Sequence, residues 1–393
     1  MFPCGHNATR SCWCSRTRRG RAKDVSGHRG AVAAGSRAPE LVCSRIVSIG
    51  ALGRLAHTRR VKPRLVRSLT AAVAFAAALF AAEALVRVVF PHARDHAIPA
   101  HLLSVDDALG WKLRPLLRST HVTRYFRVEY VTDELGFRDA RRTFSSGQPR
   151  TRLLLYGDSM VFGWGIPEGQ RFSDRLEQAG RDLQVLNHGV PGYGLDQEVL
   201  AYEAEPSRAD EAMFFVGEST LRRIHSPFIY AKYKPMFVAD PDGRLKLVPV
   251  PQTKNRTVFL AYGALSPFYL PYLVQDEVTW LTMPSTSSDP ALVDGLTEAI
   301  LRRALDVATR RRERMSVLVA NLSQTDRLEL RRVCREAAIQ CFEIPPALSV
   351  DDESDDANDL IFGHFDKHWN EKANELIARE LLRYLTSQTT GDR

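Results

Sequence analysis

The stretch from Arg152 to Pro167 constrains the fold more than any other part of the chain. Its apolar run, Leu153–Tyr156, ends at a glycine, which is typical of a buried parallel strand. Gly157-Asp-Ser159 follows as a tight turn, and a helical pattern covers Phe172–Leu183. Such a turn places a serine hydroxyl above the carboxyl end of a sheet, near backbone N–H groups of the next helix. An ordinary strand–helix loop shows the same triplet, so the interpretation depends on the rest of the chain.

Two further groups of a serine site occur near the C-terminus. Asp366 and His368 lie two residues apart, just before a predicted helix at 371–385. A serine hydroxyl is a weak nucleophile and needs a positioned base. A histidine supplies that base near neutral pH, and a carboxylate holds the imidazole in the right tautomer. We therefore predict Ser159 as nucleophile, His368 as base and Asp366 as the residue that orients it.

The core alternates strand and helix patterns, which predicts a parallel sheet with right-handed crossovers. The carboxyl ends of parallel strands meet at one edge of a sheet. Ser159, Gly192, Glu218 and His368 all follow predicted strands, so we expect them to meet there. The predicted strands are Leu153–Tyr156, Gln184–Asn187, Ala212–Val216, Ser316–Ala320 and Cys341–Ile344.

Three sequence blocks occur together in this chain: Gly157-Asp-Ser159, Asn187-His-Gly-Val-Pro-Gly-Tyr-Gly194 and Asp366-Lys-His368. Together they resemble the SGNH/GDSL hydrolase superfamily, above all its membrane-anchored bacterial members related to alginate O-acetyltransferases. The resemblance covers roughly residues 105–385, and its last block has the spacing of the acetyltransferase-type members. It implies a three-layer α/β/α sandwich with a five-stranded, flavodoxin-like parallel sheet and no metal or organic cofactor. It also implies an oxyanion hole formed by the backbone N–H groups of Ser159 and Gly192.

The block after the third strand departs from the family pattern. The family has Gly-x-Asn-Asp there and uses the asparagine as a further oxyanion donor, whereas our alignment places Glu218 at that position. An ionised carboxylate cannot donate a hydrogen bond. Three consequences stay open: two donors suffice, a neighbour such as Ser219, Thr220 or Arg222 substitutes, or catalysis is lost. The residues expected to line the site are Asp158, Asn187, Glu218 and Ser219.

Residues 1–62 are predicted to form a disordered basic tail, because they are rich in Arg, Gly, Ala and Ser without a sustained period. They hold 13 Lys or Arg and 2 Asp or Glu, whereas the rest of the chain holds 41 and 44. The rest is nearly neutral, so we expect no nucleic-acid partner. The cysteines of the tail lack a metal-binding spacing. No methionine lies between Met1 and Met160, and one hypothesis is that translation begins later, for example at Val61.

Residues 68–90 are predicted to form one transmembrane helix, because they are almost entirely apolar and long enough to cross a bilayer. Glu83 and Arg87 lie four apart and can pair near the membrane edge. Basic residues upstream place the N-terminus in the cytoplasm and everything after Phe90 outside, in the periplasm of a Gram-negative cell. Two alternatives are a buried core helix and a signal peptide cleaved near Ala82-Glu-Ala84.

The main domain is predicted at residues 151–386, followed by a short tail at 387–393. Residues 91–150 are expected to pack against it, and the alternation of Tyr125–Val131 predicts a strand pair. An insertion at about 222–290 is predicted to contain a hairpin with an Asp-Gly turn. Its aromatic residues serve either packing or contact with sugars.

A cysteine pair in the main domain leaves two alternatives open, and an acidic run near the C-terminus predicts no binding site. Cys334 and Cys341 either form a disulfide or remain two buried thiols. The acidic run at 351–359 lacks an ordered calcium-loop pattern and is interpreted as a solvated loop.

The sequence therefore predicts an extracytoplasmic serine hydrolase that acts on ester bonds, a carboxylesterase or a deacetylase of an envelope glycan or lipid. One alternative is an O-acyltransferase that modifies an exported polysaccharide, since the same acyl-enzyme serves both reactions. An alternative from another class is a catalytically inactive glycan-binding envelope protein. The expected partners are an ester or acylated-glycan substrate and, through residues 68–90, a lipid bilayer. The sequence makes no prediction of the oligomeric state.

Overall fold

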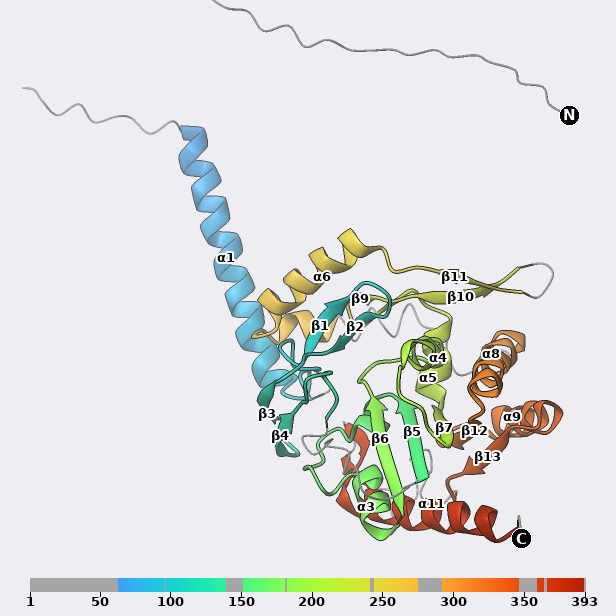
Figure 1. Ribbon diagram of the computed structural model, residues 1–393. Coiled ribbons are helices and arrows are strands. Elements are labelled where there is room, and N and C mark those ends of the chain that lie inside the picture. The colour runs from blue at the N-terminus through green and yellow to red at the C-terminus, as the bar shows by residue number, and fades with distance from the viewer. Residues whose placement is uncertain are drawn as a thin grey trace, which may run out of the picture. The chain divides into compact units, whose positions relative to one another are not determined.

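The computed structural model describes residues 63–391 except 96, 139–150, 181, 241–243, 275–291, 346–358 and 364–365. The predicted basic tail and most of the acidic run lie outside the described residues. At the centre of the main domain, five strands form one parallel sheet (Figure 1). They are β5 (Thr151–Gly157), β6 (Leu183–Gly189), β7 (Glu211–Val216), β12 (Arg314–Val319) and β13 (Gln340–Glu343).

Each of these strands overlaps one predicted strand, so the predicted sheet is confirmed. Their order across the sheet is β13-β12-β7-β5-β6. Counted along the chain within this sheet, that order is the flavodoxin-like one, in which the second strand lies outside the first.

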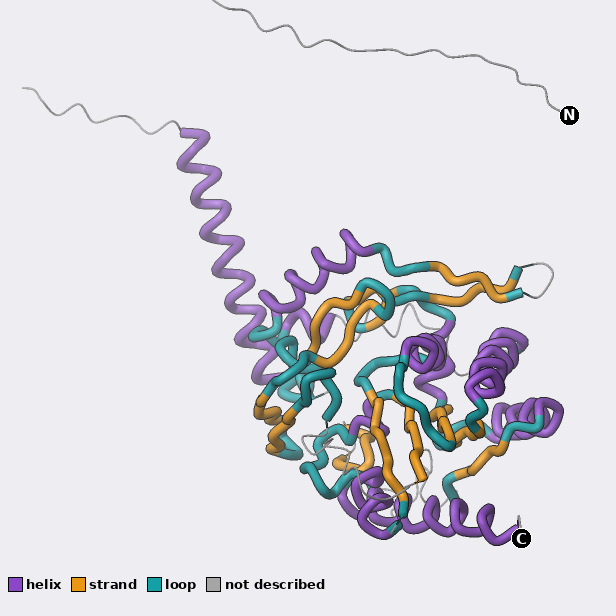
Figure 2. Tube along the Cα trace, in the orientation of Figure 1, coloured by secondary structure: helices purple, strands orange, loops and turns teal. Residues whose placement is uncertain are grey.

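Helices cover both faces of the sheet because successive strand side chains point to opposite sides. Leu154 and Tyr156 of β5 belong to one apolar cluster, whereas Leu153 and Leu155 belong to another. The first cluster includes residues of α4 (Leu195–Ala204), α8 (Gly295–Arg311) and α9 (Gln324–Ala337). The second includes residues of α3 (Phe172–Ala179) and α11 (Glu371–Gly391). Figure 2 shows the resulting three layers, which confirms the predicted α/β/α sandwich.

The sheet has a switch point beside β5. This strand pairs with β6 on one side and with β7 on the other. The connection from β5 to β6 and the connection from β6 to β7 therefore run in opposite directions across the sheet. Two short helices begin at this edge: α2 (Ser159–Phe162) follows β5, and α5 (Glu218–Ile224) follows β7. Open α/β sheets bind their ligands at such a place, outside the carboxyl ends of the strands.

Two hairpins from the preceding segment pack beside this edge. β1 (Leu103–Asp106) pairs with β2 (Gly110–Leu113), and β3 (Arg118–Val122) pairs with β4 (Arg127–Val131). Their side chains share a third apolar cluster with the main domain, which includes Trp111, Tyr130, Phe162, Trp164 and Tyr193. Polar contacts add to it, because the indole N–H of Trp111 donates to the Pro191 carbonyl at 3.1 Å.

The insertion after α5 contains two short strand pairs and a helix. β8 (Phe228–Ile229) pairs with β9 (Lys232–Tyr233), and β10 (Met236–Ala239) pairs with β11 (Leu245–Val248). The second pair is the predicted hairpin, although residues 241–243 of its turn lie outside the described part. The helix α6 (Gln252–Leu265) follows.

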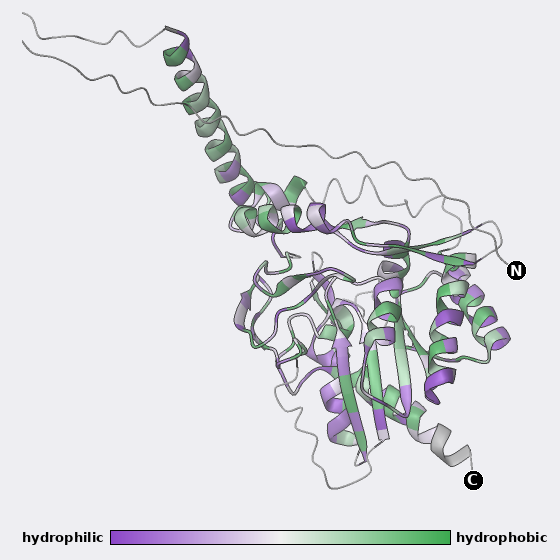
Figure 3. Cartoon of the chain, turned by 45° about the horizontal axis from the view of Figure 1, so that its top comes forward, coloured by the Kyte–Doolittle hydropathy of each residue, from purple (hydrophilic) through white to green (hydrophobic). Residues whose placement is uncertain are grey.

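The helix α1 (Pro63–Val89) is long and apolar enough to cross a membrane. The hydropathy colours of Figure 3 show that most of its residues are hydrophobic. Most of its side chains are exposed, so it is not a buried core helix. Glu83 and Arg87 form the expected pair at 2.7 Å. Elsewhere, a disulfide joins Cys334 of α9 to Cys341 of β13, which is one of the two alternatives that the sequence left open.

Candidate active site

The sequence around Ser159 folds into the turn that joins β5 to α2. Asp158 is the N-cap of α2, and its carboxylate accepts a hydrogen bond from the Met160 N–H at 2.9 Å. That bond satisfies one of the N–H groups that a helix start leaves unpaired. Gly157 is required in the turn because a Cβ atom there would lie 2.2 Å from the Val161 side chain. Ser159 thus becomes the first residue of α2, directly beyond the carboxyl end of β5.

Ser159, His368 and Asp366 form a continuous hydrogen-bonded chain, and we call these three residues the triad. The Oγ of Ser159 lies 2.8 Å from the Nε2 of His368, and the Nδ1 of the same ring lies 2.7 Å from the Oδ1 of Asp366. His368 and Asp366 both belong to β15 (Asp366–Trp369), which pairs with β14 (Ile361–Gly363) just ahead of α11. The structure therefore brings a serine and a histidine 209 positions apart into hydrogen-bonding distance.

The surroundings of Asp366 suit an orienting carboxylate. Its side chain is fully buried, and it also accepts hydrogen bonds from the backbone N–H of His368 at 3.2 Å and from the indole N–H of Trp164 at 3.3 Å. A carboxylate facing Nδ1 assigns the ring proton to that nitrogen, which leaves the Nε2 lone pair directed at Ser159. This is the tautomer in which imidazole can take a proton from the serine.

Trp164 is a site residue to which the sequence analysis gave no role. Its ring stacks on the ring of His368, with centroids 5.1 Å apart and an interplanar angle of 25°. Together with the bond to Asp366, this contact restricts the orientation of both triad partners. The sequence signal was its place between Gly163 and Gly165, whose φ angles of 78° and 71° let the chain turn just after the serine.

A second histidine lies behind Trp164 and is neutral at ordinary pH. The ring of His121 meets that of Trp164 edge-on at 4.7 Å, and its Nδ1 lies 3.2 Å from the hydroxyl oxygen of Tyr130. Burial lowers the pKa of His121 to about 3, and this outweighs the opposing effect of the Asp366 carboxylate. His121 therefore adds no positive charge beside the triad.

Gly192 lies in the turn that follows β6. Its φ of 86° belongs to the left-handed region, which costs an L-residue about 1–2 kcal/mol. A Cβ atom there would also lie 3.2 Å from the Tyr230 ring and 3.4 Å from the Trp111 ring. The Val190 N–H donates to the Gly157 carbonyl at 2.9 Å, which ties this turn to the serine turn. Among the described residues, none accepts a hydrogen bond from the Gly192 N–H.

Glu218 is paired with a cation on the surface of α5. Its carboxylate accepts a hydrogen bond from the Nε of Arg222 at 2.8 Å, and its side chain is 36% exposed. The carboxylate faces solvent and Arg222, so the site is not built around a buried carboxyl here. The structure describes no contact between Glu218 and the triad.

Ser219 and Arg223 instead converge on Asp158, the residue before the serine. The Ser219 hydroxyl donates to the Oδ2 of Asp158 at 3.0 Å, and the Arg223 guanidinium donates to the same oxygen at 2.7 Å. Arg223 also donates to the Tyr193 carbonyl at 2.9 Å and to the Tyr230 hydroxyl at 3.2 Å. These bonds connect the turns after β5, β6 and β7. The sequence analysis missed Arg223, since nothing in its local pattern indicates burial.

Asn187, predicted to line the site, stabilises the turn that carries Ser159. Its amide donates to the Val161 carbonyl at 2.6 Å and to the Ser173 hydroxyl at 2.8 Å, and its carbonyl accepts from the Gly189 N–H at 2.9 Å. The side chain is buried, so its contacts hold α2 against the end of β6.

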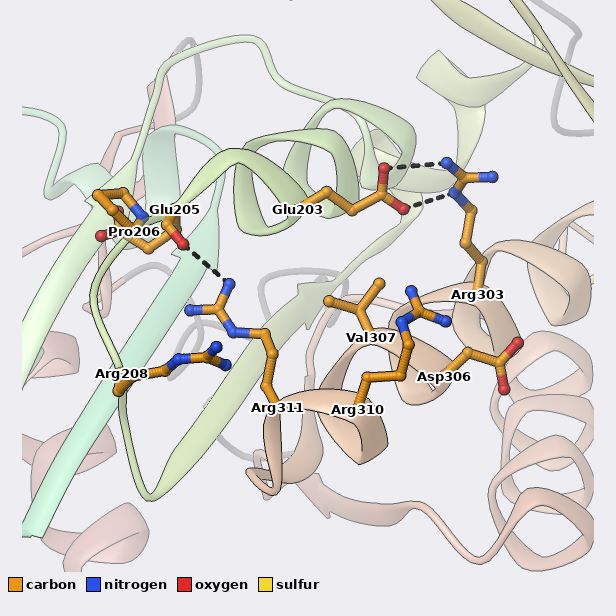
Figure 4. A pocket seen from close by; sticks show the side chains of 9 residues that line it. All are labelled: Glu203, Glu205, Pro206, Arg208, Arg303, Asp306, Val307, Arg310 and Arg311. Carbon is orange, nitrogen blue, oxygen red and sulfur yellow. Dashed lines mark hydrogen bonds and ion pairs between the residues drawn. The ribbon is translucent and has the colours of Figure 1, made fainter.

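A separate hollow of about 560 Å³ lies between α4 and α8 (Figure 4). It contains no residue of the triad. Its walls are charged, and Arg303 forms a bidentate pair with Glu203 across it at 2.6 and 2.9 Å. Within the described part of the chain, no group of three or more His, Cys, Asp or Glu could hold a metal ion. The lining residues are Glu203, Glu205, Pro206, Arg208, Arg303, Asp306, Val307, Arg310 and Arg311.

No protein-family profile and no curated protein matches this sequence. Among solved structures, the chain is similar to a member of the lipolytic protein G-D-S-L family from Veillonella parvula DSM 2008. That likeness has 11% identity and a TM-score of 0.34, and it covers 60% of this chain and 98% of the other. The chain is also similar to a salicylyl-acyltransferase from a tetracycline biosynthetic pathway, with 14% identity, a TM-score of 0.29 and coverage of 62% and 57%. At such low values these are comparisons of fold, and the function rests on this chain's own geometry.

Proposed function

We propose that this chain is a serine enzyme of the SGNH/GDSL type that acts on ester bonds. The observation that carries the proposal is the chain of contacts from Asp366 through His368 to Ser159, at 2.7 and 2.8 Å. It lies at the switch point of a flavodoxin-like sheet, where such folds bind their ligands. The proposed catalytic domain spans residues 151–386, and it includes the insertion at about 222–290. The two described hairpins of the segment 91–150 pack against it.

In the proposed reaction, Ser159 attacks the carbonyl carbon of an ester while His368 Nε2 takes its proton. Asp366 stabilises the imidazolium that forms and keeps Nδ1 protonated. The tetrahedral intermediate carries negative charge on the former carbonyl oxygen, and the N–H groups of Ser159 and Gly192 are its proposed donors. The intermediate collapses when His368 returns the proton to the leaving alcohol, which leaves an acyl group on Ser159.

The acyl-enzyme is then released by a second nucleophile. His368 deprotonates either water or the hydroxyl of an acceptor, whose oxygen bonds to the acyl carbon. The bond from that carbon to the Oγ of Ser159 then breaks, and His368 returns the proton to Oγ. Water gives a hydrolase, a carboxylesterase or deacetylase of an envelope glycan or lipid. A sugar hydroxyl gives an O-acyltransferase for an exported polysaccharide. The inactive glycan-binding alternative was motivated by Glu218, and the pairing of Glu218 with Arg222 weakens that motivation.

The proposed location is a single-pass membrane protein with its N-terminus in the cytoplasm and the catalytic domain outside. Basic residues precede α1, which supports this orientation by the positive-inside rule. The disulfide between Cys334 and Cys341 is in keeping with an oxidising compartment. Cysteine alkylation of the full chain in intact cells, with and without prior reduction, tests the side on which this pair lies.

Labelling with a fluorophosphonate tests the enzyme proposal directly. The full chain in detergent should be labelled at Ser159, and Ser159→Ala and His368→Ala should lose labelling and lower kcat on p-nitrophenyl acetate by up to about 10⁶-fold. Ser104→Ala is the matched control, because that hydroxyl lies on β1 and, within the described part of the chain, bonds the Lys112 carbonyl alone. A folded protein that is never labelled would favour the glycan-binding alternative. Adding a polysaccharide acceptor and detecting acylated sugar would favour transfer over hydrolysis.

A further inference from the structure

An uncharged stretch of chain lies at the C-terminal half of α6 and just beyond it. Residues 258–274 contain no Asp, Glu, Lys, Arg or His. Several of their large apolar side chains are about half exposed or more: Leu260 is 77% exposed, Leu265 48%, Phe268 43% and Val274 53%. We call these four residues the α6 apolar surface. Exposed apolar side chains gathered in one such region mark an interaction site more often than isolated ones do.

This stretch is bonded to the last turns of α1. The Glu83 carboxylate accepts hydrogen bonds from the backbone N–H groups of Tyr269 and Leu270, each at 2.9 Å. Arg87, which pairs with Glu83, donates to the Pro267 carbonyl at 3.3 Å. Figures 1 and 3 both show the end of α6 beside the end of α1. The two segments therefore share one level along the axis of α1.

The position of that level follows from the length of the apolar part of α1. Arg67 and Arg87 are 20 residues apart, which corresponds to about 30 Å of α-helix, the thickness of the hydrocarbon core of a bilayer. If α1 spans a membrane, Arg87 lies at the outer boundary of the hydrocarbon. The chain bonded to Glu83 and Arg87 lies at the same boundary. Val88, one residue beyond Arg87, is still 80% exposed, as expected for a helix face in contact with lipid.

The aromatic and basic residues nearby fit such a boundary. The guanidinium groups of Arg87 and Arg94 lie over the Tyr269 ring at 5.1 and 5.3 Å, and Arg94 also lies over Tyr272 at 5.7 Å. Tyrosine is enriched at the level of the lipid head groups, and arginine beside it can face anionic phosphates. The N-terminal half of α6, by contrast, carries Lys254 and Arg256.

We infer that the α6 apolar surface is a second membrane contact, inserted into the boundary between head groups and acyl chains of the bilayer that holds α1. Its occupant is phospholipid, and helices that lie in this zone bury their apolar face about 5–10 Å deep. One contact through α1 alone leaves the domain free to pivot, whereas two contacts fix its orientation over the membrane surface. The inference rests on α1 spanning the bilayer and does not depend on the proposed chemistry.

Quenching by brominated phospholipids tests this inference on the full chain in lipid nanodiscs that hold one copy each. Leu260→Trp and Phe268→Trp add a reporter to the α6 apolar surface. Leu328→Trp is the matched control, since Leu328 is 57% exposed on α9. Phe75→Trp, in the middle of α1, reports the hydrocarbon centre. The signal of each reporter is its fluorescence after subtraction of that of the unsubstituted chain.

Bromine near the head-group end of the acyl chains should quench the reporters at 260 and 268 more strongly than bromine near the methyl end. The reporter at 75 should show the opposite order, and the reporter at 328 should be quenched by neither lipid. The inference is overturned if the reporters at 260 and 268 are quenched no more than the one at 328 while the one at 75 is quenched. Loss of quenching at 75 as well would refute the span itself. The two failures are therefore distinguishable.

Discussion

Replacing Arg223 with methionine leaves the Asp158 carboxylate buried without its cationic partner. Arg223 donates to Asp158 at 2.7 Å, and the exposed fractions of the two side chains are only 6% and 1%. The substitution also removes the bonds to the Tyr193 carbonyl and the Tyr230 hydroxyl. Methionine retains the apolar volume of the stem, so the change acts mainly through charge and hydrogen bonding.

Breaking a buried ion pair by removing one partner costs about 3–5 kcal/mol, because it leaves an uncompensated charge. At about 2 °C per kcal/mol for a chain of this size, Tm should fall by roughly 6–10 °C. The double variant Arg223→Met with Asp158→Asn has no charge left at this pair, and asparagine still caps a helix. It should therefore recover about 1 kcal/mol or more of the loss.

Thermal unfolding of the full chain in detergent, followed by near-ultraviolet circular dichroism, measures these shifts. Arg383→Met is the matched control, because it removes the surface pair with Glu380 on α11, whose side chains are 66% and 31% exposed. Such a pair is worth roughly 0.2–1 kcal/mol. The reasoning is refuted if Arg223→Met shifts Tm no more than Arg383→Met, or if adding Asp158→Asn lowers Tm further.

Three other substitutions have defined outcomes. Asp366→Asn keeps the volume but favours the wrong tautomer of His368, so kcat on p-nitrophenyl acetate should fall by about 10⁴-fold; a fall below tenfold would contradict the role of Asp366. Gly192→Ala strains a positive φ and presses on the Tyr230 ring, so kcat should fall by about 10²–10³-fold with KM little changed; an unaltered kcat would remove Gly192 from the oxyanion hole. His121 has a pKa of about 3 when folded and about 6.5 when unfolded, so the unfolded state binds the extra proton and stability is lost as pH falls below 6.5. His121→Phe should therefore abolish about 2 kcal/mol of the loss between pH 7.5 and 5, seen as a smaller drop in Tm; an equal drop in both proteins would show that another group titrates.

The strands of the sheet were predictable from the sequence, whereas their flavodoxin-like order was an expectation from the family resemblance. The central strands β5, β7 and β12 each contain an apolar run, and in β5 and β7 nearly every side chain is buried. Such runs depend on local composition alone, and alternation with helices then restricts the sheet to a few topologies. The serine turn could be predicted for the same reason, because Gly157 and Asp158 contact residues that are close to them in the sequence.

The residues that hold the site together could not be predicted from the sequence. Arg223 and Trp164 act on partners that are distant in sequence, Asp158 and Asp366, and nothing in a local window shows whether an arginine or an indole is buried. The alignment of the third strand and of the Leu221-Arg222 that follows it predicts that Glu218 faces the site. Its actual partner, Arg222, lies one helical turn away, and the first turn of α5 decides which of its side chains faces Asp158.

Pre-steady-state hydrolysis of p-nitrophenyl acetate tests the central claim most directly. If Ser159 forms an acyl-enzyme, p-nitrophenol is released before the acetyl group is hydrolysed from the serine. The account predicts a burst of p-nitrophenol that approaches one per chain, with an acetyl group on the peptide that contains Ser159. The burst should be absent from Ser159→Ala. A turnover without any burst or acylated serine, or a burst that survives Ser159→Ala, would contradict it.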